Sequence, residues 1–108
     1  MEMLNSVEIK GRVGNARIQE YKVNVLQMSV CTEYVFRAKD GTTMIDCTWH
    51  KVTYFIRPED DLKTFEKIGK GSFVHVKGRI RESRYTDASG VERSTYEIVA
   101  RSVEVIQG

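Results

Sequence analysis

Residues 48–55 read T-W-H-K-V-T-Y-F and contain Trp49, the only tryptophan of the chain. Because side chains alternate along a strand, Trp49, Lys51 and Phe55 are predicted to share one face of it. Two aromatic rings with a cation between them favour the stacking of nucleobases and the pairing of a phosphate with the ammonium. Packing alone also favours aromatic residues in strands, so a structural role for this face stays open.

The length of the chain, 108 residues, suits one hydrophobic core, so we expect residues 1–108 to form a single domain. Charged residues make up 30% and hydrophobic residues 41%, which is ordinary for a globular protein. No apolar run has the length of a membrane span, and no basic-then-apolar leader precedes the first predicted strand. We therefore expect no membrane contact and a cytoplasmic location.

Potential metal ligands are few and scattered. The chain has two cysteines, Cys31 and Cys47, and two histidines, His50 and His75, with no CxxC motif. A metal site needs a tighter cluster of ligands, so we expect neither a metal nor a cofactor. Both cysteines are expected to be reduced, half-buried thiols.

The net charge is only +2, but its distribution along the chain is uneven. Seven basic residues stand against three acidic ones between Lys67 and Arg93, whereas four acidic residues stand against one lysine between Pro58 and Glu66. A surface that binds a polyanion would give this pattern, and so would two solvated faces of opposite sign. Charge alone therefore leaves both interpretations open.

Alternating apolar and polar residues predict five strands. Gly11 and Gly14 interrupt the first strand, which indicates a bulge or a sharp bend. In the second strand the apolar positions change phase between Val25 and Leu26, which predicts another bulge there. The predicted strands are Leu4–Val13 with an extended continuation over Asn15–Tyr21, Lys22–Phe36, Met44–Ile56, Phe73–Tyr85 and Tyr96–Ile106. The expected core positions of the fourth strand are Val74, Val76, Gly78 and Ile80.

One short helix is predicted after the third strand, because Pro58 suits a first helical position and three acidic residues follow it. A glycine, Gly69 or Gly71, is expected to end the helix. Its apolar stripe would cover one end of a barrel and consists of Leu62, Phe65 and Ile68.

Turn signals at Asp40-Gly41 and Asp87–Gly90 separate the remaining strands. The resulting order is three strands, a helix and two strands. That is the order of an OB-fold, a five-stranded Greek-key barrel that binds oligonucleotides and oligosaccharides, so we expect an all-β fold of this kind.

Motifs for catalysis are lacking in the sequence. There is no nucleophile elbow, phosphate-binding loop or His-Glu metal motif, so we expect a protein that is not an enzyme. The candidate binding residues instead combine rings with nearby cations. Each base stacked on a ring contributes on the order of 1–3 kcal/mol, and cations along the same groove add a salt-dependent term. The candidate nucleic-acid-binding residues are Phe36, Trp49, Phe55, Tyr85, Lys51, Arg81, Arg84, Arg12 and Arg37.

Five segments of the chain form a characteristic set. They are T-W-H-K-V at 48–52 followed by Tyr54-Phe55, K-G-S-F-V-H-V-K-G-R-I-R at 70–81, R-Y-T-D-A-S-G at 84–90, the first strand ending G-R-V-G at 11–14, and residues 94–106. In these segments the sequence resembles the bacterial single-stranded DNA-binding proteins. The resemblance spans nearly the whole chain in the right order and spacing.

The resemblance implies an OB-fold that coats single-stranded DNA without sequence preference in replication, recombination and repair. It places the base-stacking rings at Phe36, Trp49, Phe55 and Tyr85, and the groove cations at Lys51, Arg81 and Arg84. It also implies a homotetramer, built from dimers that pair their first strands, in the nucleoid-associated cytoplasm. The chain ends at Gly108 without the acidic tip with which this family recruits other proteins, so we expect no tail-mediated replication partners in this form.

Two other functions stay open. A primosomal or RNA-binding OB module would share the fold but discriminate at the 2′-OH or prefer structured RNA. An oligomeric interaction protein would bury the same outward rings between its subunits.

Overall fold

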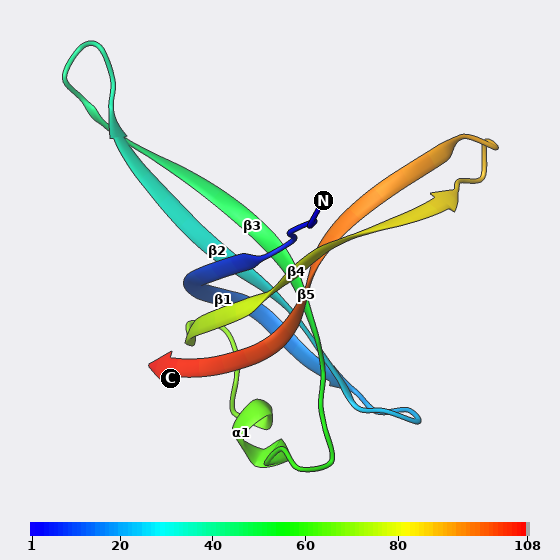
Figure 1. Ribbon diagram of the computed structural model, residues 1–108. Helices are drawn as coiled ribbons and strands as arrows, with labels where there is room; N and C mark the ends of the chain where they lie inside the picture. The colour runs from blue at the N-terminus through cyan, green and yellow to red at the C-terminus, as the bar shows by residue number, and fades with distance from the viewer. Residues whose placement is uncertain (108) are drawn as a thin grey trace.

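The computed structural model describes residues 1–107, which contain five strands and one short helix (Figure 1). The strands close into a barrel in the order β1-β2-β3-β5-β4. All pairs of neighbours are antiparallel except β3 with β5. This confirms the predicted all-β OB-fold with its helix between the third and fourth strands. The elements are β1 (Val7–Gln19), β2 (Val25–Arg37), β3 (Thr43–Phe55), α1 (Leu62–Glu66), β4 (Phe73–Thr86) and β5 (Glu92–Gln107).

The core follows from the two-residue period of the strands. In β2, Leu26, Met28 and Val30 are buried, and the residues between them are half-buried. This is the pattern of a strand with one face on a core. The buried hydrophobic residues are Val13, Leu26, Met28, Val30, Val52, Tyr54, Ile56, Phe65, Ile68, Val74, Val76, Ile98 and Ala100.

The first hairpin differs from the sequence prediction. β1 is one strand that extends to Gln19. It contains a bulge at Gly14, where the pairing with β2 shifts between Val13 and Asn15. The predicted bulge between Val25 and Leu26 is wrong, because both residues pair regularly with β1 and with β3. β2 begins at Val25 rather than Lys22, so residues 20–24 belong to the turn and need not follow the strand alternation.

The helix begins later than predicted. Pro58 lies in a turn in which the Asp60 amide donates to the Arg57 carbonyl at 3.0 Å, and the helix starts at Leu62 after Asp61 as its N-cap. Tyr54 donates its hydroxyl to the Asp60 carboxylate at 2.5 Å, which fixes this turn against the barrel. Burial, together with this bond, raises the pKa of Tyr54 to about 12. Phe65 and Ile68 are buried as predicted, and the helix lies at the barrel end opposite the two long hairpins (Figure 1).

Two hairpins extend from the other end of the barrel in diverging directions (Figure 1). One is β2–β3 with its turn at Gly41, and the other is β4–β5 with its turn at Gly90. β3 and β5 pair only from Val52 opposite Ile98 to Tyr54 opposite Ala100. Beyond that point they separate, so Ile80, opposite Ile98 on β4, is 48% exposed. Ile80 lies on the inner side as predicted, opposite the buried Ile98, but it is only partly covered because the barrel ends there.

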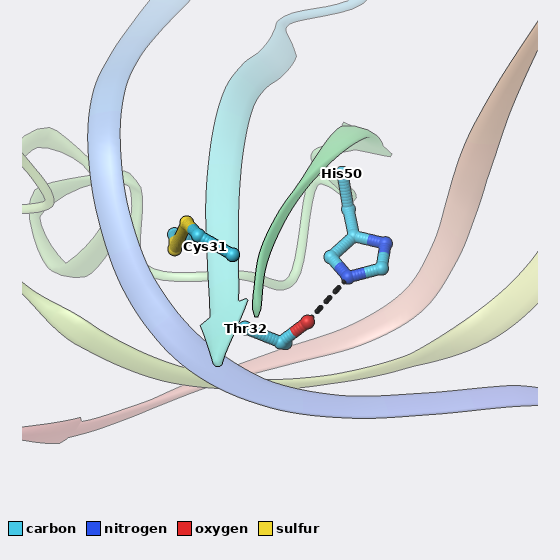
Figure 2. The surroundings of a disulfide bond; sticks show 4 residues. Cys31, Thr32 and His50 are labelled. Atoms are coloured by element: carbon cyan, nitrogen blue, oxygen red, sulfur yellow. Dashed lines mark hydrogen bonds between the residues drawn. A yellow bond between two sulfur atoms is a disulfide. The ribbon is translucent and has the colours of Figure 1, made fainter. Parts of the chain in front are cut away.

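The two cysteines are joined by a disulfide, so the prediction of reduced thiols is wrong (Figure 2). In the β2–β3 register Cys31 stands opposite Trp49 and Cys47 opposite Glu33. The cysteines are thus diagonal neighbours on one face, with their Cα atoms 6.4 Å apart, within the usual range for a disulfide. On the other face of this hairpin, the Thr32 hydroxyl lies 2.8 Å from Nε2 of His50.

We predict that the purified, unreduced protein releases no free thiol on unfolding. The two cysteines are 16 positions apart, and closing a loop of about 15 residues is worth about 3 kcal/mol through the unfolded chain. Reduction, or Cys31→Ser, should lower the free energy of unfolding by about that amount. Two titratable thiols in the unfolded, unreduced protein would contradict the disulfide.

Candidate nucleic-acid interface

Cross-strand pairing arranges the candidate residues in rows on the outer face of the barrel. Arg12 on β1 pairs with Cys31 on β2, which pairs with Trp49 on β3. Partners in a ladder point to the same side, so the Arg12 and Trp49 side chains flank the disulfide on this face. Trp49 is 59% exposed, and its ring reaches over β2 to Gly14.

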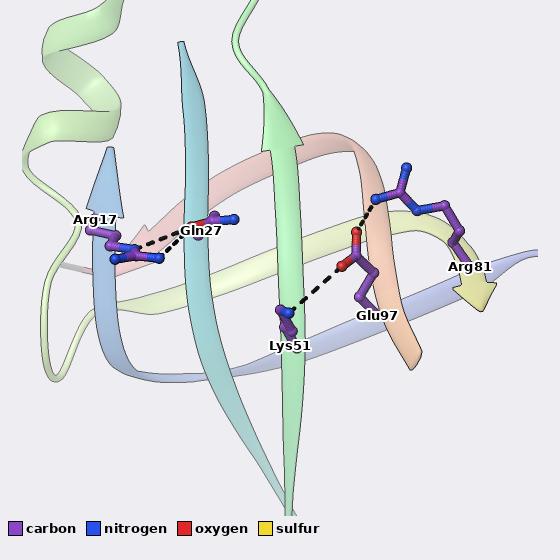
Figure 3. Close-up of polar contacts among 5 residues, drawn as sticks. All are labelled: Arg17, Gln27, Lys51, Arg81 and Glu97. Atoms are coloured by element: carbon purple, nitrogen blue, oxygen red, sulfur yellow. Dashed lines mark hydrogen bonds and ion pairs between the residues drawn. The ribbon is translucent and has the colours of Figure 1, made fainter. Parts of the chain in front are cut away.

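The next row lies across β3, β5 and β4 and consists of Lys51, Glu97 and Arg81 (Figure 3). The Lys51 Nζ lies 3.9 Å from one Glu97 carboxylate oxygen, and the Arg81 guanidinium lies 2.6 Å from the other. This row joins the part of the face on β3 to the part on the β4–β5 hairpin. Lys51 also stands two residues from Trp49, on the same side of β3.

Two more aromatic residues are exposed on the outer face. Phe55 is 44% exposed at the end of β3, and Tyr85 is 51% exposed near the tip of β4–β5. Tyr85 is in phase with Arg81, and Phe55 is in phase with Lys51, so both rings point to the outer side. Seven of the nine candidates share this face: Arg12, Arg37, Trp49, Lys51, Phe55, Arg81 and Tyr85.

The register places Phe36 and Arg84 on the other face of their hairpins. Phe36 pairs with Met44, one residue out of phase with the ladder that carries Trp49. Its ring stacks with that of Tyr34, with centroids 6.2 Å apart and planes at 27°. Sequence analysis missed Tyr34, although its spacing of two residues from Phe36 on a strand was a signal for it.

A hollow of about 280 Å³ opens where β3 and β5 separate. Trp49 and Lys51 line it from β3, and Tyr96 and Glu97 line it from β5. Tyr96 is 63% exposed, and its hydroxyl donates to the Glu82 carboxylate at 3.3 Å. Sequence analysis also missed Tyr96, because only the closed barrel brings residue 96 close to residue 49.

Each of the three basic residues that the family resemblance places in the groove forms an ion pair with a carboxylate. Glu97 binds Lys51 and Arg81, and Glu82 binds Arg84 at 3.2 Å. Hydrogen bonding from Ser94, and then from Arg84, lowers the pKa of Glu82, so Glu82 stays charged. Among the described residues, Arg12 and Arg37 form no ion pair.

The exposed rings and cations of the outer face are of the kind that binds nucleic acids. Within residues 1–107, no three His, Cys, Asp or Glu side chains gather in a way that could hold a metal ion. No helix in this part of the chain is long and apolar enough to cross a membrane. Exposed rings beside cations can instead stack unpaired bases and hold phosphates.

We predict that Gly14→Ala displaces the Trp49 ring. A Cβ built at Gly14 would lie 2.6 Å from the ring, closer than side chains approach in proteins. The emission of Trp49 in the DNA-free protein should therefore shift, and its quenching by acrylamide should increase. Gly69→Ala is the matched control, because nothing lies within 4 Å of a Cβ there. Unchanged emission in Gly14→Ala would contradict the contact.

Comparison with known proteins places these residues in a family. The family model described as "Single-strand binding protein family" matches residues 4–106. A single-stranded DNA-binding protein of Neisseria meningitidis serogroup A is 30% identical over 108 residues, which cover 97% of this chain and 61% of that protein. One of Xanthomonas axonopodis pv. citri is 29% identical over 108 residues, covering 97% of this chain and 59% of that protein. The chain thus spans about three-fifths of the length of these relatives.

A solved structure supports the fold independently. The structure "Plasmodium falciparum SSB complex with ssDNA" superimposes with a TM-score of 0.80 at 19% identity, covering 100% of this chain and 97% of that one. At this identity the similarity concerns the fold alone. The fold as a whole therefore has a counterpart in a solved structure.

Proposed function

Because the chain belongs to the single-strand binding protein family, we propose that it binds single-stranded DNA without sequence preference and coats it during replication, recombination and repair. The observation that carries the proposal is the outer face, where Trp49, Phe55 and Tyr85 are exposed beside Lys51 and Arg81. Rings stack on any base, and cations pair with any phosphate, so such a face needs no particular sequence.

We propose a binding role without catalysis. A protein that binds only the unpaired state shifts the equilibrium of a hairpin or a duplex toward single strands by mass action. That effect protects exposed strands and removes secondary structure without any reaction. The proposed place of action is the nucleoid-associated cytoplasm, and the proposed binding unit is one domain.

The relatives named as single-stranded DNA-binding proteins support DNA as the ligand. An RNA-binding module with the same fold is the second candidate, since rings and cations alone accept RNA as well. RNA recognition would use the 2′-OH, and a comparison of oligo-dT with oligo-U separates the two candidates.

We predict that Trp49→Ala weakens binding to oligo-dT by about 5- to 150-fold, because one stacked base contributes about 1–3 kcal/mol. The measurement is fluorescence anisotropy of a labelled oligonucleotide at fixed salt. Tyr21→Ala is the matched control, because Tyr21 is an exposed ring, 82% accessible, in the turn between β1 and β2. Its affinity should be unchanged.

A large loss of thermal stability in Trp49→Ala would mean that the ring is part of the core. An unchanged affinity together with an intact fold would remove the central strand from the proposed site. Either result contradicts the proposal for Trp49.

The second proposed partner is another copy of the chain, in a homotetramer. The resemblance supports this assembly, as do large hydrophobic side chains that are exposed on the β2–β3 hairpin, among them Val35 and Ile45 at 59% and 61%. We predict a tetrameric mass in sedimentation equilibrium at micromolar concentration. A monomeric mass under these conditions would overturn the assembly but not the DNA-binding face.

A further inference from the structure

We propose that Glu97 competes with DNA phosphates for Lys51 and Arg81, and so limits both the affinity and the salt dependence of the outer face. This inference rests on the proposed function, because it assumes that these two cations meet phosphates. It assigns to one carboxylate the role of an internal competitor within the binding site.

The contacts of Glu97 explain why it can hold both cations at once. Arg81 stands directly opposite Glu97 in the β4–β5 ladder, and Lys51 adjoins it where β3 pairs with β5. One carboxylate oxygen of Glu97 lies 2.6 Å from the Arg81 guanidinium, and the other lies 3.9 Å from the Lys51 Nζ (Figure 3). The Glu97 side chain is only 11% exposed, whereas the Lys51 and Arg81 side chains are 58% and 41% exposed.

The difference in exposure decides the direction of the effect. A phosphate can reach the two exposed cations, but water reaches little of the carboxylate that holds them. The negative charge of Glu97 is therefore weakly screened where a phosphate would approach. In the DNA-free protein these three side chains together present one net positive charge instead of two.

The hydrogen bonding of the Arg81 guanidinium is incomplete. Its Nε atom is buried and has no hydrogen-bond partner within the described residues. A buried donor without an acceptor is unfavourable, so the contact with Glu97 leaves part of the guanidinium unsatisfied. A phosphate can accept from two donors of Arg81, but Arg81 must give up its 2.6 Å contact with the mostly buried Glu97 carboxylate to reach it.

Removal of the Glu97 charge should thus release cations for DNA. On a single strand each phosphate neutralised by a cation contributes about 0.7 to the slope of log affinity against log salt. Glu97→Gln leaves one more net positive charge among these side chains, so it should steepen the slope by about 0.7. The affinity advantage of the variant should then grow by about 3.5-fold when salt is lowered sixfold.

The experiment is a salt series of oligo-dT binding for the wild-type chain and Glu97→Gln, with thermal unfolding of both. Glu104→Gln is the matched control, because it removes the same charge from β5 at a residue opposite His75, away from Lys51 and Arg81. Its slope should equal that of the wild type. If Glu97→Gln is unstable, Glu97→Met provides a second uncharged side chain of similar length.

A triple variant tests whether the effect passes through the two cations. In a Lys51→Met, Arg81→Met background, Glu97→Gln should no longer steepen the slope. If Glu97 instead positions the cations for DNA, Glu97→Gln will weaken binding in the otherwise wild-type chain, and the proposal is overturned. An unchanged slope in a folded variant also overturns it. Absence of salt-dependent binding by the wild type would be a failure of the proposed function itself.

Discussion

The short parallel contact between β3 and β5 is the constraint on which the rest of the structure depends. Three residue pairs, from Val52 opposite Ile98 to Tyr54 opposite Ala100, close the barrel. Without them the chain would be an open sheet whose edge strands expose unpaired backbone groups. Because the contact is short, β3 and β5 then separate, and each continues into a long hairpin with its antiparallel neighbour (Figure 1). The same contact places Lys51 beside Glu97 and opens the hollow between Trp49 and Tyr96.

The outer face combines exposed aromatic rings with two cations that already form ion pairs with Glu97. Trp49 is 59% exposed, and its ring lies against Gly14, where a side chain would collide with it. Lys51 and Arg81 share one carboxylate, so their charges are partly compensated before any ligand arrives. In the proposed complex a base would meet an exposed ring, whereas a phosphate would have to compete with Glu97 for the cations.

Much of the fold could be predicted from the sequence, because local signals set it. Alternation identified the strands, Asp40-Gly41 marked the turn between β2 and β3, and the apolar stripe located the helix. The phase change near Val25 misled the prediction, because a turn residue, Val23, was counted with the strand. Pro58 misled it too, since the hydrogen bonds of Asp60 form a turn before the helix.

The site was less accessible to prediction, because its contacts depend on register and closure. Alternation within β3 correctly placed Trp49, Lys51 and Phe55 together. The disulfide requires the pairing of β2 with β3 to be known to the residue, and the ion pairs of Glu97 require the barrel to be closed. Phe36 was grouped with Trp49 by its place beside a loop, although the register separates their faces.

The most direct test of the central claim uses the single tryptophan as its own reporter. The intrinsic fluorescence of Trp49 is followed during titration with unlabelled oligo-dT, at low and at high salt. Strong quenching at saturation, with an affinity that falls as salt rises, is the predicted result, since a base would then lie on the ring and phosphates on the cations. Saturable binding that leaves the Trp49 emission unchanged would contradict the account, because DNA would then bypass the outer face.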